Sequence, residues 1–105
     1  MSLLVEYTLK EGRAEEQAEA LRAFVAGLNA LGDQGFHYSA FETDDPTRFI
    51  GLLEFGDDEA KQNFLKSAPF AEYRENAQDR FSAAPNATQI RLVASTKTGI
   101  FSAFG

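Results

Sequence analysis

The chain has 105 residues, a formal net charge of -6 and no cysteine. This length suits one core, so we take residues 1–105 as a single domain. Without a run of Lys or Arg, nucleic acid and anionic membranes are poor candidates as partners, and without cysteine there is no disulfide, thiolate nucleophile or cysteine-ligated metal site. No stretch has the composition of a signal peptide or a membrane-spanning helix, and we expect a cytoplasmic protein.

The first half of the chain predicts a strand, a helix and a β-hairpin. Apolar and polar side chains alternate over residues 3–9, which is the period of a strand with one covered face. Apolar side chains recur at intervals of three and four over residues 13–31, which predicts an amphipathic helix closed by Gly32. Residues 35–42 and 48–55 are strand-like, and the polar, proline-containing turn between them predicts an antiparallel return.

The second half predicts two short helices and a last strand. A capping Asp and an acidic first turn predict a helix from about Asp58 to Lys66. Ser67-Ala68-Pro69 supplies a cap and a first-turn proline for a second helix, which we expect to end near Arg80 or Phe81. Residues 88–96 alternate as a strand. The tail carries three apolar side chains that we expect to dock on a partner subunit: Ile100, Phe101 and Phe104.

This order of elements is that of the ferredoxin-like βαββαβ fold, an α+β sandwich whose four-stranded antiparallel sheet carries helices on one face. The strand Arg48–Phe55 is apolar on both alternating faces, and the helices suffice for only one of them. We therefore expect the second face to pack on the same face of another copy, giving a homodimer that closes into an α/β-barrel.

Strand parity assigns side chains to the two faces of the sheet. The set predicted to lie under the helices is Leu3, Val5, Tyr7, Leu9, Phe36, Tyr38, Ala40, Phe49, Leu53, Phe55, Ile90, Leu92 and Ala94. The set predicted to face the partner is Leu4, Glu6, Thr8, His37, Ser39, Phe41, Ile50, Leu52, Glu54, Arg91, Val93 and Ser95. Buried charges need partners, so we interpret Glu6, His37, Glu54 and Arg91 as a polar network that centres the dimer.

Several stretches resemble the antibiotic biosynthesis monooxygenase family of dimeric α/β-barrel proteins. They are Val5–Gly12 leading into the first helix, Asp45–Phe49 and Leu53–Phe55 in the hairpin, Asp58–Ala60, and Ser67–Phe70. The resemblance implies a homodimer with a pocket in each subunit between helices and sheet. It also implies the family's chemistry, which is cofactor-free oxidation of quinol-like aromatic substrates by dioxygen, or haem degradation.

The chain departs from the family pattern at positions that bear on this chemistry. Asn63 and Pro69 stand where many relatives have histidine. The haem-degrading branch relies on an Asn, a Trp and a His, whereas this chain has no Trp, Phe64 stands near the Trp position and Arg74 near the His position. We therefore set haem aside and expect no cofactor.

The candidate site is an aromatic pocket with few polar groups, which suits a small aromatic or apolar ligand. Its predicted lining is Tyr7, Phe24, Tyr38, Phe64, Phe70, Tyr73 and Phe81. As catalytic groups we consider Asn63 and Tyr73 for stabilising an oxyanion, and His37, whose ordinary pKa suits a base. Strand parity places His37 on the dimer side of the sheet, so the alternative to a catalytic base is a paired histidine in the interface. The alternative for the aromatic residues is that they form plain core.

Two functions fit these observations. The first is a cofactor-independent monooxygenase acting on a small phenolic or quinol-type metabolite. The second is a non-catalytic dimeric α/β-barrel protein that binds a small apolar ligand. A single histidine and the lack of a glycine-rich phosphate loop leave no competing chemistry, and we expect no metal site.

Overall fold

The computed structural model describes residues 1–96. The elements follow in the order β1 (Ser2–Thr8), α1 (Ala14–Ala30), β2 (Phe36–Glu42), β3 (Arg48–Phe55), α2 (Asp58–Leu65), α3 (Ala68–Ala77) and β4 (Asn86–Ile90). The predicted docking of Ile100, Phe101 and Phe104 falls outside the described residues. None of the helices within residues 1–96 combines the length and apolar character that crossing a bilayer requires.

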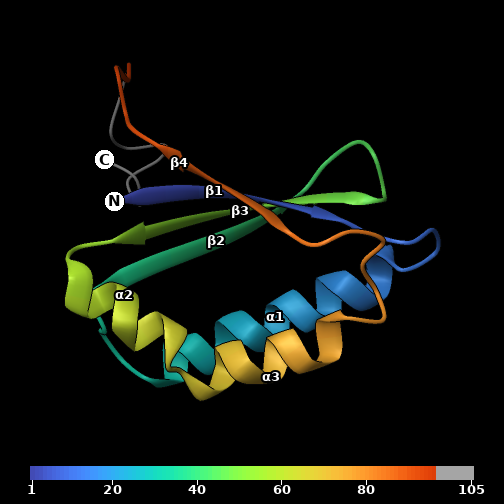
Figure 1. Cartoon of the computed structure of the whole chain (residues 1–105), viewed down its shortest axis with the longest axis horizontal. Helices are drawn as coiled ribbons and strands as arrows, with labels where there is room; N and C mark the ends of the chain where they lie inside the picture. Colours follow the sequence, from blue (N-terminus) through green and yellow to red (C-terminus); the bar gives the residue numbers. More distant parts are fainter. Residues whose placement is uncertain (97–105) are drawn as a thin grey trace.

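The strands form one antiparallel sheet in the order β2-β3-β1-β4, and the helices lie on one side of it (Figure 1). The predicted ferredoxin-like α+β fold is confirmed. Strand β3 spans the predicted residues and lies between β1 and β2, so both of its edges are hydrogen-bonded. Burial along β3 alternates, with Phe49, Gly51, Leu53 and Phe55 buried under the helices.

Local signals start α2 and α3 where the sequence predicted them, whereas α3 ends at Ala77, before the predicted end near Arg80 or Phe81. The side chain of Asp57 accepts a hydrogen bond from the backbone N–H of Ala60 and caps α2, and Ser67 does the same for α3 through the N–H of Phe70. Gly32 follows α1 with a φ of 79°, in the left-handed region where a residue without a Cβ is favoured.

The last strand differs from the prediction in both its bounds and its facing. Strand β4 begins at Asn86 and ends at Ile90, because Ile90 already pairs with Ser2 at the start of β1 and no strand remains beside the residues that follow. Directly paired residues share a face, so Ile90 lies with Ser2 on the uncovered side and Ala87 lies with Val5 under the helices. The predicted placement of Ile90, Leu92 and Ala94 under the helices is therefore wrong.

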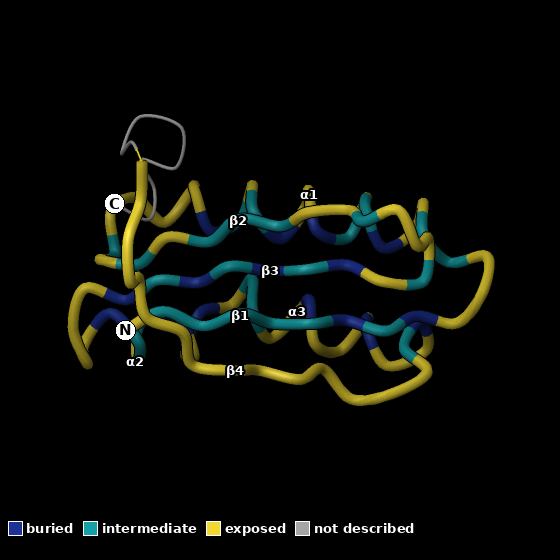
Figure 2. The backbone as a smooth tube through the Cα atoms, turned by 90° about the horizontal axis from the view of Figure 1, so that it is seen from above, coloured by how far each residue is buried: buried dark blue, intermediate teal, exposed yellow. Residues whose placement is uncertain are grey.

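The uncovered face of the sheet, onto which Figure 2 looks, carries apolar side chains that are partly exposed. Leu4 pairs with Leu52 at its centre, both half-buried, and Phe41 lies beside Ile50 with 41% of its surface exposed. This apolar character agrees with the parity prediction for β1, β2 and β3.

Of the four charged residues predicted to centre the dimer, Arg91 lies outside the sheet. Glu6 pairs with Arg48 across β1 and β3 at 2.9 Å, whereas Arg91 is exposed beyond the end of β4. His37 lies opposite Glu54 in the register of β2 and β3. Arg91 is misplaced because β4 ends at Ile90, before it.

Candidate active site

Aromatic side chains from both layers converge beneath α1 and α3. Phe24 of α1 stacks on Tyr73 of α3 with ring centroids 4.8 Å apart, and Phe64 of α2 lies 4.8 Å from Phe70. From the sheet, Tyr38 lies 5.2 Å from the Phe24 ring. Together these rings line a cavity of about 410 Å³.

The helix periods explain why these rings meet. The buried positions of α1 are Gln17, Leu21, Phe24 and Leu28, spaced by three and four residues on one face. In α3, the Ser67 cap fixes the first turn, so Phe70 and Tyr73 at a spacing of three fall on the same side of the helix. The cavity follows from two short helix faces that oppose the apolar face of the sheet.

A buried polar network borders the cavity behind Tyr73. The Gln17 side-chain amide donates to the Tyr73 hydroxyl at 2.7 Å, and its carbonyl oxygen accepts from Arg80 Nε at 2.9 Å. Gln17 is fully buried and Arg80 is 2% exposed, yet among the described residues no carboxylate pairs with Arg80 and its Nη2 has no hydrogen-bond partner. The arginine instead donates through Nη1 to the Asn76 carbonyl and lies over the Tyr73 ring.

This network gives the Tyr73 hydroxyl a positive environment. Burial raises the pKa of Tyr73, while the hydrogen bond from Gln17 and the charge of Arg80 act in the opposite direction. The phenol is thus neutral near pH 7. Because its oxygen accepts from Gln17, its own proton is available to a group in the cavity.

A second phenolic contact joins the two strands that flank β3. The hydroxyls of Tyr7 and Tyr38 are 2.7 Å apart, and both rings line the cavity. Burial is the main cause of the raised pKa of each of these phenols. Both are therefore uncharged over the physiological range.

The charged residues that line the cavity are cations. Lys61 of α2 and Arg74 of α3 belong to the lining, and the Arg74 guanidinium lies 5.2 Å from the centre of the Phe70 ring. Neither a carboxylate nor a histidine is among the described residues of this lining. The cavity therefore favours a ligand that is neutral or negatively charged.

The sequence model of the antibiotic biosynthesis monooxygenase family matches residues 1–76, which hold β1 to β3, α1, α2 and most of α3. The chain belongs to the antibiotic biosynthesis monooxygenase family. The matched region includes Tyr73 and Gln17, whereas Arg80 and Phe81 lie beyond its end.

Solved structures of this family's fold resemble the chain along most of its length. A protein of unknown function from Nitrosomonas europaea is 25% identical, with a TM-score of 0.75 and coverage of 91% of each chain. A protein from Pseudomonas aeruginosa is 21% identical, with a TM-score of 0.75 and coverage of 89% of this chain and 93% of that one. A structure named antibiotic biosynthesis monooxygenase is 14% identical, with a TM-score of 0.73 and coverage of 89% and 98%. No curated protein matches the chain in sequence.

The structure of this family member brings together the predicted aromatic residues and separates two of the predicted catalytic groups from them. The cavity lining includes Tyr7, Phe24, Tyr38, Phe64, Phe70, Tyr73 and Phe81. Asn63 is not in the lining, and its side-chain amide donates to the Gln34 carbonyl at 3.4 Å. His37 is exposed on the uncovered face of the sheet, as its parity indicated, so it does not reach the cavity.

Sequence reasoning missed Gln17 and Arg80. A signal for Gln17 existed, since an uncharged polar side chain sits in the apolar repeat four residues before Leu21. Arg80 follows the end of α3, where nothing local indicates that the chain folds back toward α1. Within residues 1–96 no cluster of metal-ligating side chains occurs.

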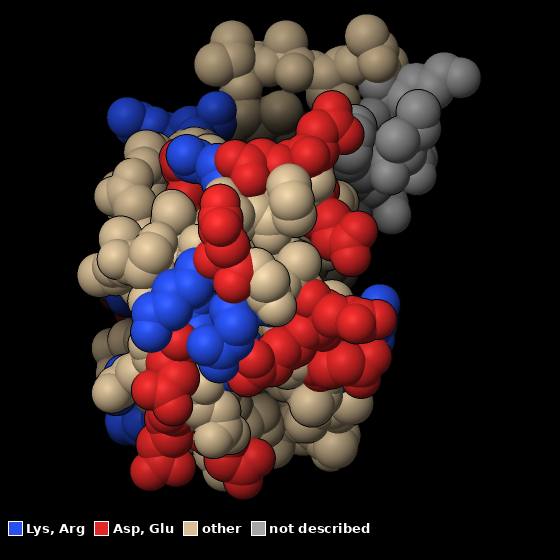
Figure 3. Space-filling view, turned by 90° about the vertical axis from the view of Figure 1, so that its right-hand side faces the viewer, with Lys and Arg blue, Asp and Glu red and all other residues tan. Residues whose placement is uncertain are grey.

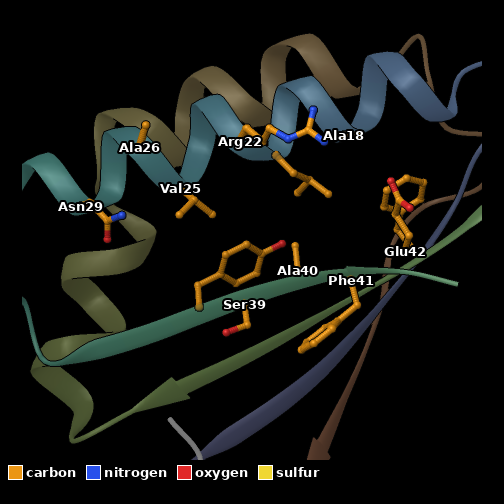
Figure 4. Close-up of a pocket in the computed structure, with 12 residues that line it drawn as sticks. Ala18, Arg22, Val25, Ala26, Asn29, Ser39, Ala40, Phe41 and Glu42 are labelled. Carbon is orange, nitrogen blue, oxygen red and sulfur yellow. The ribbon is translucent and has the colours of Figure 1, made fainter. Parts of the chain in front are cut away.

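A second groove lies between α1 and the free edge of β2 (Figure 4). Its volume is about 590 Å³, and Val25 of α1 points across it toward β2, which contributes Ala40 to the lining. Of the predicted site residues, it includes Tyr38 alone among its described lining. The groove has mostly small or apolar walls, and the polar network lies outside it.

Proposed function

We propose that this protein is a monooxygenase that works without a prosthetic group on a small phenolic or quinol-type aromatic metabolite. The observation that carries this proposal is the aromatic cavity, in which the Tyr73 hydroxyl is held by Gln17 and Arg80. Membership of the antibiotic biosynthesis monooxygenase family supports the reaction class. The flat, ring-lined walls support an aromatic substrate.

The chemistry begins with an electron-rich substrate anion. Lys61 and Arg74 in the lining and the free proton of Tyr73 favour a phenolate over the neutral phenol. Without a histidine or carboxylate in the described lining, the substrate itself supplies the acidity by losing its phenolic proton to water. The anion then reduces dioxygen, and oxidation of a ring methylene to a carbonyl places one oxygen atom in the product and releases the other as water.

Oxygen uptake with a panel of anthrones and dihydroxynaphthalenes tests this function. We expect uptake that rises with pH through the phenolic pKa of each substrate. Tyr73→Phe should lower kcat about a hundredfold, because it removes a donor to the developing oxyanion. His37→Ala is the matched control and should keep the activity, since His37 lies on the opposite face of the sheet. An absence of turnover across the panel would refute the monooxygenase.

The second candidate is a non-catalytic protein that binds a small apolar ligand. The observation that favours it is the same lack of a histidine or carboxylate in the described cavity lining. Ligand-observed NMR with the same compounds separates the two functions. Binding without oxygen uptake would support the second candidate.

The proposal includes a homodimer formed through the uncovered sheet face, in a cytoplasmic protein. The apolar patch around Leu4 and Leu52 supports the dimer, because an exposed apolar surface of this kind is costly in water. On the end of the molecule where α1 begins, charged groups alternate in sign, with acidic patches around a basic group (Figure 3). The uncovered sheet face is therefore the better interface.

A further inference from the structure

The two phenols that join β1 and β2 meet above a glycine of the strand between them. Gly51 of β3 pairs with Val5 on one side and Ala40 on the other, on the helix side of the sheet. A Cβ at Gly51 would lie 3.0 Å from both Cε1 and the hydroxyl oxygen of Tyr38, and 3.1 Å from the Tyr7 hydroxyl. Glycine weakens a central strand, and here the close approach of two hydroxyls accounts for it.

The contact between the two tyrosine hydroxyls leaves one of their O–H protons unused. Two hydroxyls bring two protons, and the contact between Tyr7 and Tyr38 uses one of them. Whichever oxygen accepts, its own proton has no acceptor among residues 1–96. A buried O–H without an acceptor is costly, and both rings border the cavity, so a ligand oxygen there would relieve that cost.

We propose that the tyrosine pair, seated on Gly51, is a recognition element that donates a hydrogen bond to a carbonyl or phenolate oxygen of an aromatic ligand. The inference rests on the proposed function of the cavity, because it assumes that an aromatic ligand binds there. It narrows the ligands to those that carry an acceptor oxygen where the ring meets the sheet. Burial raises the pKa of both phenols, so the pair donates its proton without ionising at physiological pH.

Two bicyclic probes that differ in one oxygen test this assignment. Tetralin and 1-tetralone have nearly the same shape, and only the ketone offers an acceptor. Ligand-observed NMR titration gives the ratio of their dissociation constants for the unmodified protein, for Tyr7→Phe/Tyr38→Phe, and for Tyr73→Phe. Tetralin affinity serves as the control for an intact cavity in each variant.

In the double variant, the preference for 1-tetralone over tetralin should fall by a factor of about three to ten, which is the range that one net hydrogen bond contributes. The affinity for tetralin should stay unchanged. Each single variant should lose less, because one hydroxyl remains. Gly51→Ala should shift the ratio in the same direction, and if it does not fold the phenylalanine variants decide.

The outcomes separate the inference from the function on which it rests. If both probes bind and the double variant keeps the preference, or if Tyr73→Phe alone abolishes it, the tyrosine pair is not the recognition element, while the cavity still binds aromatic ligands. If neither probe binds the unmodified protein, the cavity does not bind such aromatics and the proposed function falls together with the inference.

Discussion

Replacing Gln17 by leucine should destabilise the protein strongly although it exchanges a neutral side chain for one of similar size. Gln17 is fully buried and holds both the Tyr73 hydroxyl and Arg80 Nε. The neutral bond contributes about 1 kcal/mol and the bond to the charged guanidinium about 2 kcal/mol, so the free energy of unfolding should fall by about 3 kcal/mol. For a chain of this size, that corresponds to a Tm lower by roughly 10 to 20 °C.

Urea unfolding followed by circular dichroism, at one fixed chain concentration, measures this change. Gln62→Leu on α2 is the matched control, because Gln62 is exposed and its substitution should stay within about 0.5 kcal/mol. The double variant Gln17→Leu/Arg80→Met should lower the free energy of unfolding by less than the sum of the two single variants, since the two side chains share a hydrogen bond. If Gln17→Leu lowers the free energy of unfolding no more than the control does, the network is not a source of stability.

Three further predictions concern pH, capping and assembly. Burial raises the pKa of Tyr7, Tyr38 and Tyr73, so above about pH 10 the unfolded chain releases protons that the folded chain keeps. The free energy of unfolding should then fall by about 1.4 kcal/mol per pH unit for each phenol. Between pH 9.5 and pH 11, the urea midpoint should fall less in Tyr38→Phe than in the unmodified protein. Equal falls would contradict the burial argument. Asp57→Ala removes the side chain that caps α2 and should lower the free energy of unfolding in urea by about 1 kcal/mol. Asp58→Ala removes no cap and should lower it less. The reverse order would be evidence against the cap. Leu52→Glu places a charge at the centre of the proposed dimer face and should give monomers or insoluble protein on sizing chromatography. Leu31→Glu, at the exposed end of α1, is the control and should leave the dimer intact. A folded dimer of Leu52→Glu would exclude this face as the interface.

Short-range chemistry made most of the secondary structure predictable. Asp57 and Ser67 each cap a helix within three residues of themselves, and Gly32 ends α1 through its own backbone freedom. Strand β3 was predicted to the residue, because its alternation and the polar turn before it are both local. The aromatic lining followed from the same periods, which fixed the helix and sheet faces.

Long-range packing decided the rest. Strand β4 ends at Ile90 because its partner β1 begins at Ser2, and no property of residues 88–96 records where a distant strand starts. Gln17 and Arg80 are 63 residues apart and meet only because α1 and α3 pack side by side. The sequence by itself therefore determined which side chains share a face of each element. Only the tertiary structure decided which faces meet, because that choice depends on pairing register and close packing between segments that are distant along the chain.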